Sequence, residues 1–427
     1  MSGQTTQTAA RTAASPDPVA GDLIGSGVEG GLGDQITAWV QRVRGGDMGA
    51  LPAIAGLIFL AILFGILSPY FLTPINFANL MNQAASLVVL GMALVFVLLL
   101  GEIDLSAGVT GGVSMAAFVV LNVKAGIPWP LALIAGFGVG LATGALIGFL
   151  VARVGIPSFV VTLGLFLGYQ GLALLIIGAG GLYPINAPEL IALQNGRLPV
   201  WGGWVMLAVM LAISAATSFW DRARRTRAGV PNRAISLVWI KLGVIAVLGG
   251  AAVAILNLNR SQSVIPIEGV PTIVPVVLAI LWVGTFALDR TRFGRYVYAI
   301  GGNAEAARRS GIKVRWVKWW CFVICSGLAV VAGLFAQARI GSVDGAAGRD
   351  IVLSGVAAAV VGGVSLFGGR GRLVHAAIGA LVIASITNGL GLLRLEAGIN
   401  LLVTGGVLIL AATVDALSRL RSGNVRS

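Results

Sequence analysis

The sequence is poor in charged residues. Of its 427 residues, 11% are Asp, Glu, Lys or Arg and 57% are hydrophobic, and the mean hydropathy is +0.94. A soluble globular chain carries about 25% charged residues. A chain with so little charge cannot cover a surface that faces water, so lipid must surround much of it. We therefore predict an all-α integral membrane protein, a polytopic helical bundle embedded in the lipid bilayer.

Nucleotide-binding and metal-binding motifs are also missing. The P-loop pattern G-x-x-x-x-G-K-[ST] does not occur, and His375 is the sole histidine. A single histidine removes His-pair metal sites and argues against a His-activated nucleophile. Cys321 and Cys325 lie four apart within one apolar run, where we interpret them as packing residues. We expect no catalytic residues, no metal site and no cofactor in this chain.

Long apolar runs fill most of the chain. A spanning helix needs about 20 apolar residues. The segment 353–367 is short and flanked by glycines, and Gly101–Asp104 interrupts two runs, so both are candidates for broken or re-entrant pieces. We expect ten to twelve spans. The candidate spans are 49–68, 81–100, 105–122, 130–151, 158–179, 203–220, 239–256, 273–288, 319–338, 353–367, 373–393 and 399–417.

Positive charge is unevenly divided between the two sides of these spans. With the N-terminus inside, 23 basic residues fall on the inner side and 6 on the outer side. The positive-inside rule then predicts a multi-pass protein of the bacterial inner membrane with both termini in the cytoplasm. Because the basic residues lie in short segments between spans, the net charge of +13 does not indicate nucleic-acid binding. We expect a disordered cytoplasmic tail over 1–47, a transmembrane domain over 48–418 and a cytoplasmic tail over 419–427.

The polar loop Asp289–Lys318 carries signals for a short helix. They predict a helix of about two turns over 304–310, on the cytoplasmic face. The alanines Ala306 and Ala307 would form a small patch rimmed by charge, suited to docking in a groove of a soluble partner. A solvated turn between helices is the alternative. The signals are Asn303 as N-cap, Glu305 in the first turn, Arg308 and Arg309 in the last turn, and Gly311 as the C′ residue.

Four motifs follow one another along the chain, at Gly101–Ser106, Pro157–Gly164, Gly301–Val314 and Val361–Gly369. They resemble those of sugar ABC importer permeases of the ribose/xylose/galactose class. Asn388-Gly389-Leu390 fits the same pattern, and the resemblance runs from about residue 50 to 418. Glu102 and the basic loop with its apolar run at 221–256 resemble the xylose-type branch. One departure is Val352–Gly355, where the family usually has Glu-Leu-Asp-Ala.

The resemblance implies a permease subunit, which is not itself an enzyme, of an ATP-driven importer for D-xylose or a similar monosaccharide. Two copies would pair, most simply as a homodimer, and move sugar by alternating access. A cytoplasmic ATP-binding subunit would use ATP and Mg. A periplasmic sugar-binding protein would deliver substrate to the outer loops 181–202, 257–272 and 339–352. The ATPase-coupling loop would comprise Gly302, Asn303, Glu305, Ala306, Ala307, Arg308, Arg309, Ser310 and Gly311.

Few polar residues are candidates for the translocation pathway. Carboxylates near membrane depth are costly unless they face partners or water, so Glu102 and Asp104, with Ser106, are the first candidates. The alternative is that Asp104 is the N-cap of the next helix. Ser365 and Asn388 are further candidates, although membrane Ser and Asn also form hydrogen bonds between helices.

Three other kinds of protein remain as alternatives. An ion-coupled secondary transporter would work without ATPase subunits, although such proteins commonly carry ionisable residues at the bilayer midplane. An ABC permease for a non-sugar solute would share the mechanism. A membrane-embedded enzyme would need a catalytic constellation that the sequence does not show.

Overall fold

The computed structural model describes residues 49–413 apart from positions 179, 231, 233, 262, 263, 397, 400, 404, 408, 411 and 412. The predicted tails 1–47 and 419–427 lie outside the described residues, as does about half of the predicted span 399–417. The chain divides into two compact units, which we describe separately. Unit 1 contains Ala208–Leu248, and unit 2 contains Arg42–Leu207 and Gly249–Ser427.

Helices make up almost all of the regular structure. Two short strands, β1 (Leu182–Pro184) and β2 (Ser342–Asp344), form an antiparallel pair, and π-helical turns follow α5 and α6 at Val120–Lys124 and Leu150–Val154. The helices are α3 (Leu51–Leu67), α4 (Pro74–Leu98), α5 (Ala107–Val119), α6 (Trp129–Phe149), α7 (Ser158–Ile177), α8 (Pro188–Asn195), α9 (Val200–Arg227), α10 (Ile235–Leu256), α11 (Ile273–Arg290), α12 (Arg292–Gly302), α13 (Ala304–Arg309), α14 (Val314–Ile340), α15 (Ile351–Val361) and α16 (Leu373–Leu392).

In the part of the chain that the structure describes, nine helices are long and apolar enough to cross a membrane. Each corresponds to one predicted apolar run, and the all-α polytopic fold is confirmed. The shorter apolar helices α3 and α15 correspond to the predicted segments 49–68 and 353–367. The nine long helices are α4, α5 with its π-helical turn, α6 with its π-helical turn, α7, α9, α10, α11, α14 and α16.

The two interrupted regions are where the sequence placed them. α15 has 11 residues, which at 1.5 Å per residue is about 17 Å, well short of a hydrocarbon core of about 30 Å. It ends at Gly362–Gly363, where Gly363 has a positive φ of 95°. Between α4 and α5 the chain leaves the helix over residues 99–106, with Gly101 at φ 74°. Both pieces are therefore broken rather than continuous spans.

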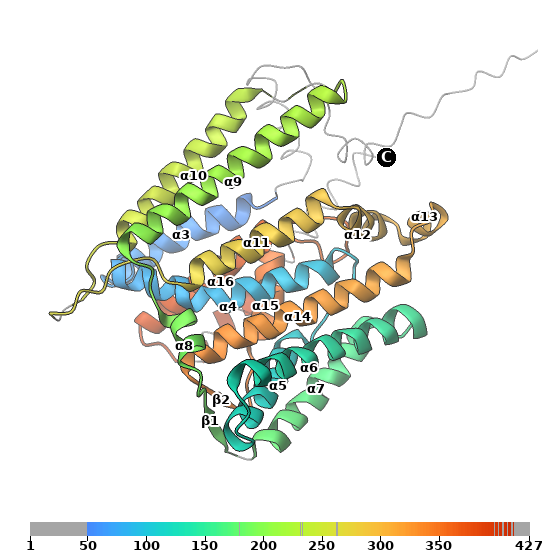
Figure 1. Cartoon of the computed structure of the whole chain (residues 1–427), viewed down its shortest axis with the longest axis horizontal. Helices are drawn as coiled ribbons and strands as arrows, with labels where there is room; N and C mark the ends of the chain where they lie inside the picture. The colour runs from blue at the N-terminus through green and yellow to red at the C-terminus, as the bar shows by residue number, and fades with distance from the viewer. Residues whose placement is uncertain are drawn as a thin grey trace, which may run out of the picture. The chain divides into compact units, whose positions relative to one another are not determined.

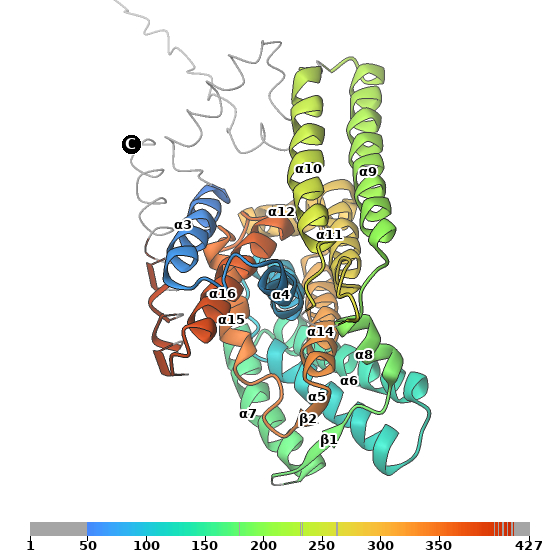
Figure 2. The ribbon, with the colours of Figure 1, turned by 90° about the vertical axis from the view of Figure 1, so that its left-hand side faces the viewer.

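Unit 2 is built around α14, which packs against α4, α5 and α6 (Figures 1 and 2). Glycines let these backbones approach closely. A Cβ added at Gly111 of α5 would lie 2.5 Å from the carbonyl oxygen of Ala329, and one at Gly140 of α6 would lie 2.1 Å from the Val330 side chain. Gly138 faces open space. Gly136 and Gly140 of α6 thus belong to a helix-packing surface.

Backbone and side-chain contacts define two opposite ends of unit 2. At the end that carries α13, called here the α13 end, the Gly369 N–H donates to the Leu99 carbonyl at 2.9 Å. At the other end, called the hairpin end, β1 pairs with β2 and the Leu198 N–H donates to the Val270 carbonyl at 2.8 Å. Segments that the charge pattern assigns to one side of the membrane therefore meet at one end of the unit.

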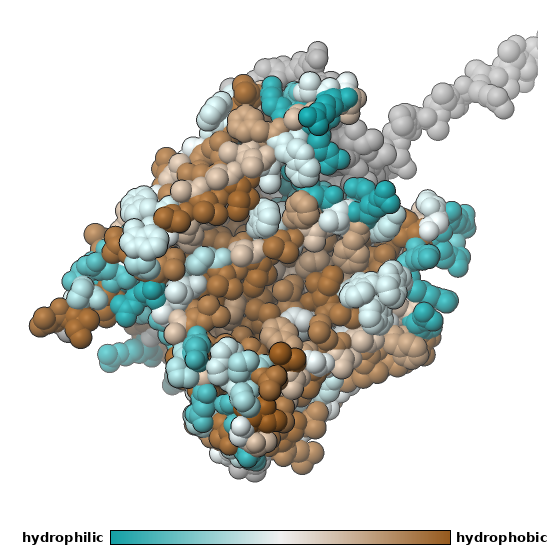
Figure 3. All heavy atoms as spheres, in the orientation of Figure 1, coloured by the Kyte–Doolittle hydropathy of each residue, from teal (hydrophilic) through white to brown (hydrophobic). Residues whose placement is uncertain are grey.

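Figure 3 shows apolar residues along the helices of unit 2 and hydrophilic residues at its α13 end. Exposed apolar side chains such as Ile134 and Leu175 belong to α6 and α7. An apolar surface between polar ends is the pattern expected of a protein that lipid surrounds.

Unit 1 comprises the second part of α9 and the first part of α10. The Phe219 and Trp239 rings meet edge to face at 6.4 Å, and Arg224 lies over the Trp220 ring at 5.7 Å. α9 continues to Arg227. The predicted span ended at 220 because the last two turns of the helix are polar and basic. Lys and Arg at a helix C-terminus also interact favourably with the helix dipole.

Candidate functional site

The predicted short helix exists as α13 and follows α12 directly. The Asn303 side chain accepts a hydrogen bond from the Ala306 N–H at 2.9 Å, which is the N-cap that the sequence predicts. Gly311 has φ 83°, a left-handed conformation that suits a C′ glycine. α12 was missed, because its polar residues interrupt any apolar run. Its N-cap, Thr291, accepts from the Gly294 N–H at 3.3 Å.

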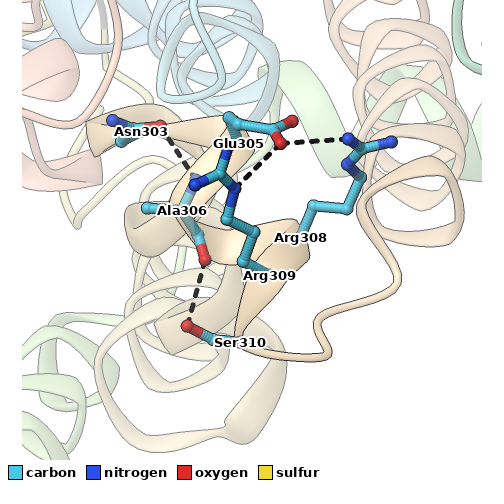
Figure 4. A network of polar contacts seen from close by, with 6 residues as sticks. All are labelled: Asn303, Glu305, Ala306, Arg308, Arg309 and Ser310. Atoms are coloured by element: carbon cyan, nitrogen blue, oxygen red, sulfur yellow. Dashed lines mark hydrogen bonds and ion pairs between the residues drawn. The ribbon is translucent and has the colours of Figure 1, made fainter.

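Glu305 binds both arginines of α13 (Figure 4). Its Oε1 accepts from Arg308 Nη2 at 3.0 Å and from Arg309 Nε at 3.1 Å. These hydrogen bonds hold the pKa of Glu305 below its usual value, so the carboxylate is charged at neutral pH. Because all three side chains are exposed, the pairs contribute little to stability. Their effect is to fix the shape and charge pattern of the α13 surface.

One part of the predicted docking patch is wrong. Ala306 is exposed, but Ala307 is only 5% exposed and belongs to the buried core. Its carbonyl accepts the Ile312 N–H at 3.1 Å. Helix periodicity explains the difference, since adjacent residues point about 100° apart. Ala307 therefore anchors α13 to the rest of unit 2, while Ala306 lies on the charged, exposed face of the helix.

The four sequence motifs meet at the α13 end, in what we call the motif junction. The Ile103 N–H donates to Ser158 Oγ at 3.2 Å, which joins the first two motifs. A Cβ on Gly301 would lie 1.8 Å from the Leu99 carbonyl oxygen and 2.6 Å from the Gly369 nitrogen. This contact joins the coupling-loop motif to the glycine motif and to the end of α4.

α12 is also tied to the loop that follows α15. The Tyr298 hydroxyl donates to the Gly371 carbonyl at 2.9 Å, and burial raises the pKa of Tyr298 to about 12. Ser365, one of the pathway candidates, lies in the same loop and is 2% exposed. Its N–H donates to the Arg370 carbonyl at 2.9 Å, and its Oγ accepts from the Phe367 N–H at 3.1 Å. Ser365 thus fixes the conformation of the loop on which α12 rests.

Glu102 lies at the motif junction. Its carboxylate is paired with Lys318 at the start of α14, and both side chains are largely buried. The pair connects the α4–α5 link to the helix that follows α13.

Asp104 and Ser106 are fully buried. Asp104 Oδ1 accepts from the Ser106 N–H at 2.9 Å and from Ser106 Oγ at 2.6 Å, while Cys325 Sγ donates to Oδ2 at 3.7 Å. The N-cap residue of α5 is Ser106 rather than Asp104. The carboxylate nevertheless binds the N–H just before the helix, in an Asx turn that organises its start.

Asn388 belongs to a different place, the contact between α16 and α4. Asn76 Nδ2 donates to Asn388 Oδ1 at 2.8 Å, and Asn388 Nδ2 donates to Asn76 Oδ1 at 3.0 Å and to Gln83 Oε1 at 3.3 Å. Asn76 was missed because the predicted span began at 81, whereas α4 begins at Pro74. The signal was present as Thr73 followed by Pro74, an N-cap with proline at the first helical position.

Among the described residues, no group of three or more His, Cys, Asp or Glu could hold a metal ion. Cys321 and Cys325 are free and buried, in keeping with their interpretation as packing residues.

Comparison with known proteins defines the class. A family model described as "Branched-chain amino acid transport system / permease component" matches residues 76–238 and 246–412. Because these segments cover more than half of the chain, the chain belongs to this family of ABC-importer permease components. No solved structure matches the chain significantly.

Curated relatives cover nearly the same length. The xylose transport system permease protein of Escherichia coli (strain K12) is 34% identical over 82% of this chain and 87% of its own. The D-allose transport system permease protein of the same organism is 30% identical over 84% and 90%. The ribose import permease protein of Bacillus subtilis (strain 168) is 31% identical over 90% and 98%. The predicted resemblance to sugar ABC permeases is confirmed.

Family membership gives the coarse role. The chain is a multi-pass inner-membrane permease component, which is not itself an enzyme and works with a separate ATPase subunit and a binding protein. The structure places the predicted coupling loop, Glu102 and Ser365 together at the motif junction. It places Asn388 apart from them, against Asn76 and Gln83 in the first half of α4.

Proposed function

We propose that this chain is the membrane-spanning subunit of an ATP-driven, binding-protein-dependent importer of D-xylose or a similar monosaccharide, and that it works by alternating access. The α13 end faces the cytoplasm in this proposal. The observation that carries it is α13 itself, a capped and charge-patterned helix whose outer face is exposed and whose buried Ala307 rests on unit 2.

The coupling loop comprises residues 302–311 and docks in a groove of the ATPase subunit. Its exposed surface consists of Ala306 framed by Glu305, Arg308 and Arg309. Because Gly301 at the end of α12 packs against the end of α4 and the glycine motif, a displacement of α13 is transmitted to both of these elements. Packed interfaces switch between discrete arrangements rather than deforming continuously. ATP and Mg are used by the ATPase alone.

A second copy of the chain completes the passage, most simply as a homodimer. At the hairpin end, the three outer loops that were predicted to receive the binding protein are joined to one another. β1 of the first loop pairs with β2 of the third, and the Leu198 N–H donates to the Val270 carbonyl of the second. One continuous surface supports docking of a periplasmic sugar-binding protein.

The sugar assignment is supported by the relatives, whose names include xylose, D-allose and ribose. The Val352–Gly355 stretch, where the motif departs from the usual acidic pattern, lies in α15. Val352 is 1% exposed and packs in the core. We infer that the change at Val352 affects helix packing, whereas Ser354, the other position of the usual acidic pattern, is half-buried and keeps a small polar side chain.

Reconstitution tests the proposal. The chain, its ATPase and its binding protein are placed in proteoliposomes, and uptake of radiolabelled D-xylose, D-ribose and D-allose is measured together with ATP hydrolysis. We expect uptake that requires ATP and the binding protein. Uptake that persists without the ATPase and is abolished by an uncoupler would instead indicate an ion-coupled transporter.

A charge reversal tests the docking surface. Replacing Glu305→Arg together with Arg308→Glu retains a helix-compatible ion pair but inverts the pattern that the ATPase meets. We expect uptake to fall by at least 10-fold while the protein still inserts and elutes as the parent does. The matched control is Arg292→Glu at the start of α12, away from α13. Normal uptake by the reversed variant would rule out α13 as the docking helix.

A further inference from the structure

The first half of α4 carries a polar arc that none of the recognised motifs includes. α4 contains no charged residue, and its polar side chains all lie before residue 87. With 3.6 residues per turn, they span an arc of about 120° around the helix. The second half of α4 is entirely apolar apart from glycine. The arc consists of Asn76, Asn79, Asn82, Gln83 and Ser86.

Two other helices border the arc. On one edge, Asn388 of α16 binds Asn76 and Gln83. On the other edge, Gln194 of α8 donates from Nε2 to the Asn82 carbonyl at 3.1 Å. The arc therefore lies between α8 and α16, and all three helices belong to unit 2.

Two amide oxygens, one in the arc and one on its α8 edge, have no hydrogen-bond partner among the described residues. Gln194 is only 1% exposed, yet its Oε1 is unpartnered, and so is Asn82 Oδ1. A buried polar atom without a partner is costly, and such atoms are rare in proteins unless a ligand or water satisfies them. Both oxygens are acceptors, so a group that donates hydrogen bonds would complete the site.

Burial changes along the arc. Asn76 is buried against Asn388, Asn79 is exposed, Asn82 and Gln83 are half-buried, and Ser86 is buried, so from Asn79 onwards burial increases along the helix. From Pro74 to Ser86 the helix rises about 18 Å, which is more than half of a hydrocarbon core of about 30 Å. Beyond Ser86, every residue of α4 up to Leu98 is buried. The arc is thus accessible at Asn79, partly accessible at Asn82 and Gln83, and closed towards the α13 end.

We propose that this polar arc, with Gln194 and Asn388, is a low-affinity subsite for a neutral, polyhydroxylated solute at the outer entrance of the passage. The subsite rests on the proposed function and names where the solute first touches the permease. Amides both donate and accept, which matches sugar hydroxyls. A zwitterionic amino acid would need charged partners, and α4 offers none.

Uptake by single variants tests the subsite in the reconstituted full transporter. Gln83→Leu removes a half-buried amide, and Gln170→Leu on α7 is the matched control, a half-buried glutamine outside the arc. We expect Gln83→Leu to lower sugar uptake per ATP hydrolysed by about 3- to 10-fold, the effect of one lost hydrogen bond, with ATPase stimulation by the loaded binding protein unchanged. Gln194→Leu should act in the same direction.

Failure of the subsite and failure of the proposed function give different results. If the parent protein imports no aldose, the proposed function fails. If the parent imports sugar and Gln83→Leu imports as much as Gln170→Leu, the subsite alone is overturned.

Chemical labelling gives a second readout that does not depend on turnover. In a background with Cys321→Ala and Cys325→Ala, a membrane-impermeant thiol reagent should modify Gln83→Cys from the hairpin side. Millimolar D-xylose or D-ribose should slow the reaction, whereas L-leucine should not. Ile134→Cys on the lipid-exposed face of α6 should stay unmodified. Protection by L-leucine but not by sugar, or no reaction at Gln83→Cys, would contradict the proposal.

Discussion

Gly301 shows how much of the coupling machinery depends on one missing side chain. It sits at the end of α12, where its Cα faces the Leu99 carbonyl and the Gly369 backbone. Neighbouring Gly302, by contrast, has nothing within 4 Å of the position of a Cβ. The two glycines look equivalent in the sequence, but only the first is required by packing.

We expect Gly301→Ala to separate α12 from α4 and the glycine motif. Overpacking of this kind costs about 1–3 kcal/mol, so the unfolding midpoint in detergent should fall and coupled uptake should drop. Gly302→Ala is the matched control and should stay within about 0.5 kcal/mol of the parent. Equal midpoints for the two variants would show that the junction is loosely packed.

The Glu102–Lys318 pair is a second residue-scale test. Lys318→Glu places two carboxylates together. We expect the free energy of unfolding to fall by more than the loss of an exposed pair, about 1 kcal/mol, and by less than the loss of one partner of a buried pair, about 3–5 kcal/mol. The exchange Glu102→Lys with Lys318→Glu should restore most of it. Thermal unfolding of the parent, the single variants Glu102→Lys and Lys318→Glu, and the double variant gives the coupling energy. Additive losses would mean that the two groups do not act as a pair.

At the scale of elements, local chemistry was sufficient for α13 but not for its neighbours. Asn303, Glu305 and Gly311 each satisfy a rule that depends on residues within one turn. α12 is amphipathic and α8 is short, so neither produces an apolar run, and both escaped the sequence reasoning. The start of α4 was placed seven residues late because asparagines interrupt its hydrophobic pattern.

The candidate site was predictable in its parts but not in its assembly. The four motifs were recognised in order, yet their meeting at one end depends on contacts between residues such as Ile103 and Ser158 that are far apart in the chain. Burial also reversed one assignment, since the exposed alanine patch is Ala306 alone. Contacts across helices depend on tertiary packing, which a single sequence does not encode in its local pattern.

The N-cap of α13 makes an element-scale prediction. Asn303→Ala removes the acceptor for the Ala306 N–H and should destabilise the helix by about 1 kcal/mol. A helix of six residues has little other stabilisation, so we expect α13 to fray and uptake per ATP hydrolysed to fall. Asn303→Asp and Asn303→Ser should retain the cap and near-normal coupling. Loss of coupling in all three variants would indicate that the ATPase recognises the asparagine itself.

At the scale of the whole molecule, the charge pattern and the contacts of unit 2 agree on which segments share a side. At the α13 end Glu102 pairs with Lys318 and the Tyr298 hydroxyl donates to the Gly371 carbonyl, and at the hairpin end Arg197 and Pro271 form a bridge. The contacts establish which segments lie together, and the charge bias alone assigns the absolute sides. The backbone contacts of unit 2 do not depend on the sign of any charge, so they support the grouping independently of the charge bias.

We therefore expect α13 to lie on the cytoplasmic side of the membrane and β2 on the opposite side. In a cysteine-free background, Ser310→Cys at the exposed end of α13 should resist a membrane-impermeant thiol reagent in intact cells and react after the membrane is opened. Ala346→Cys, exposed just after β2, should react in intact cells. The reverse pattern would place α13 outside the cytoplasm, where no ATP-hydrolysing partner could reach it. The proposed docking would then fail even though the fold and family stand.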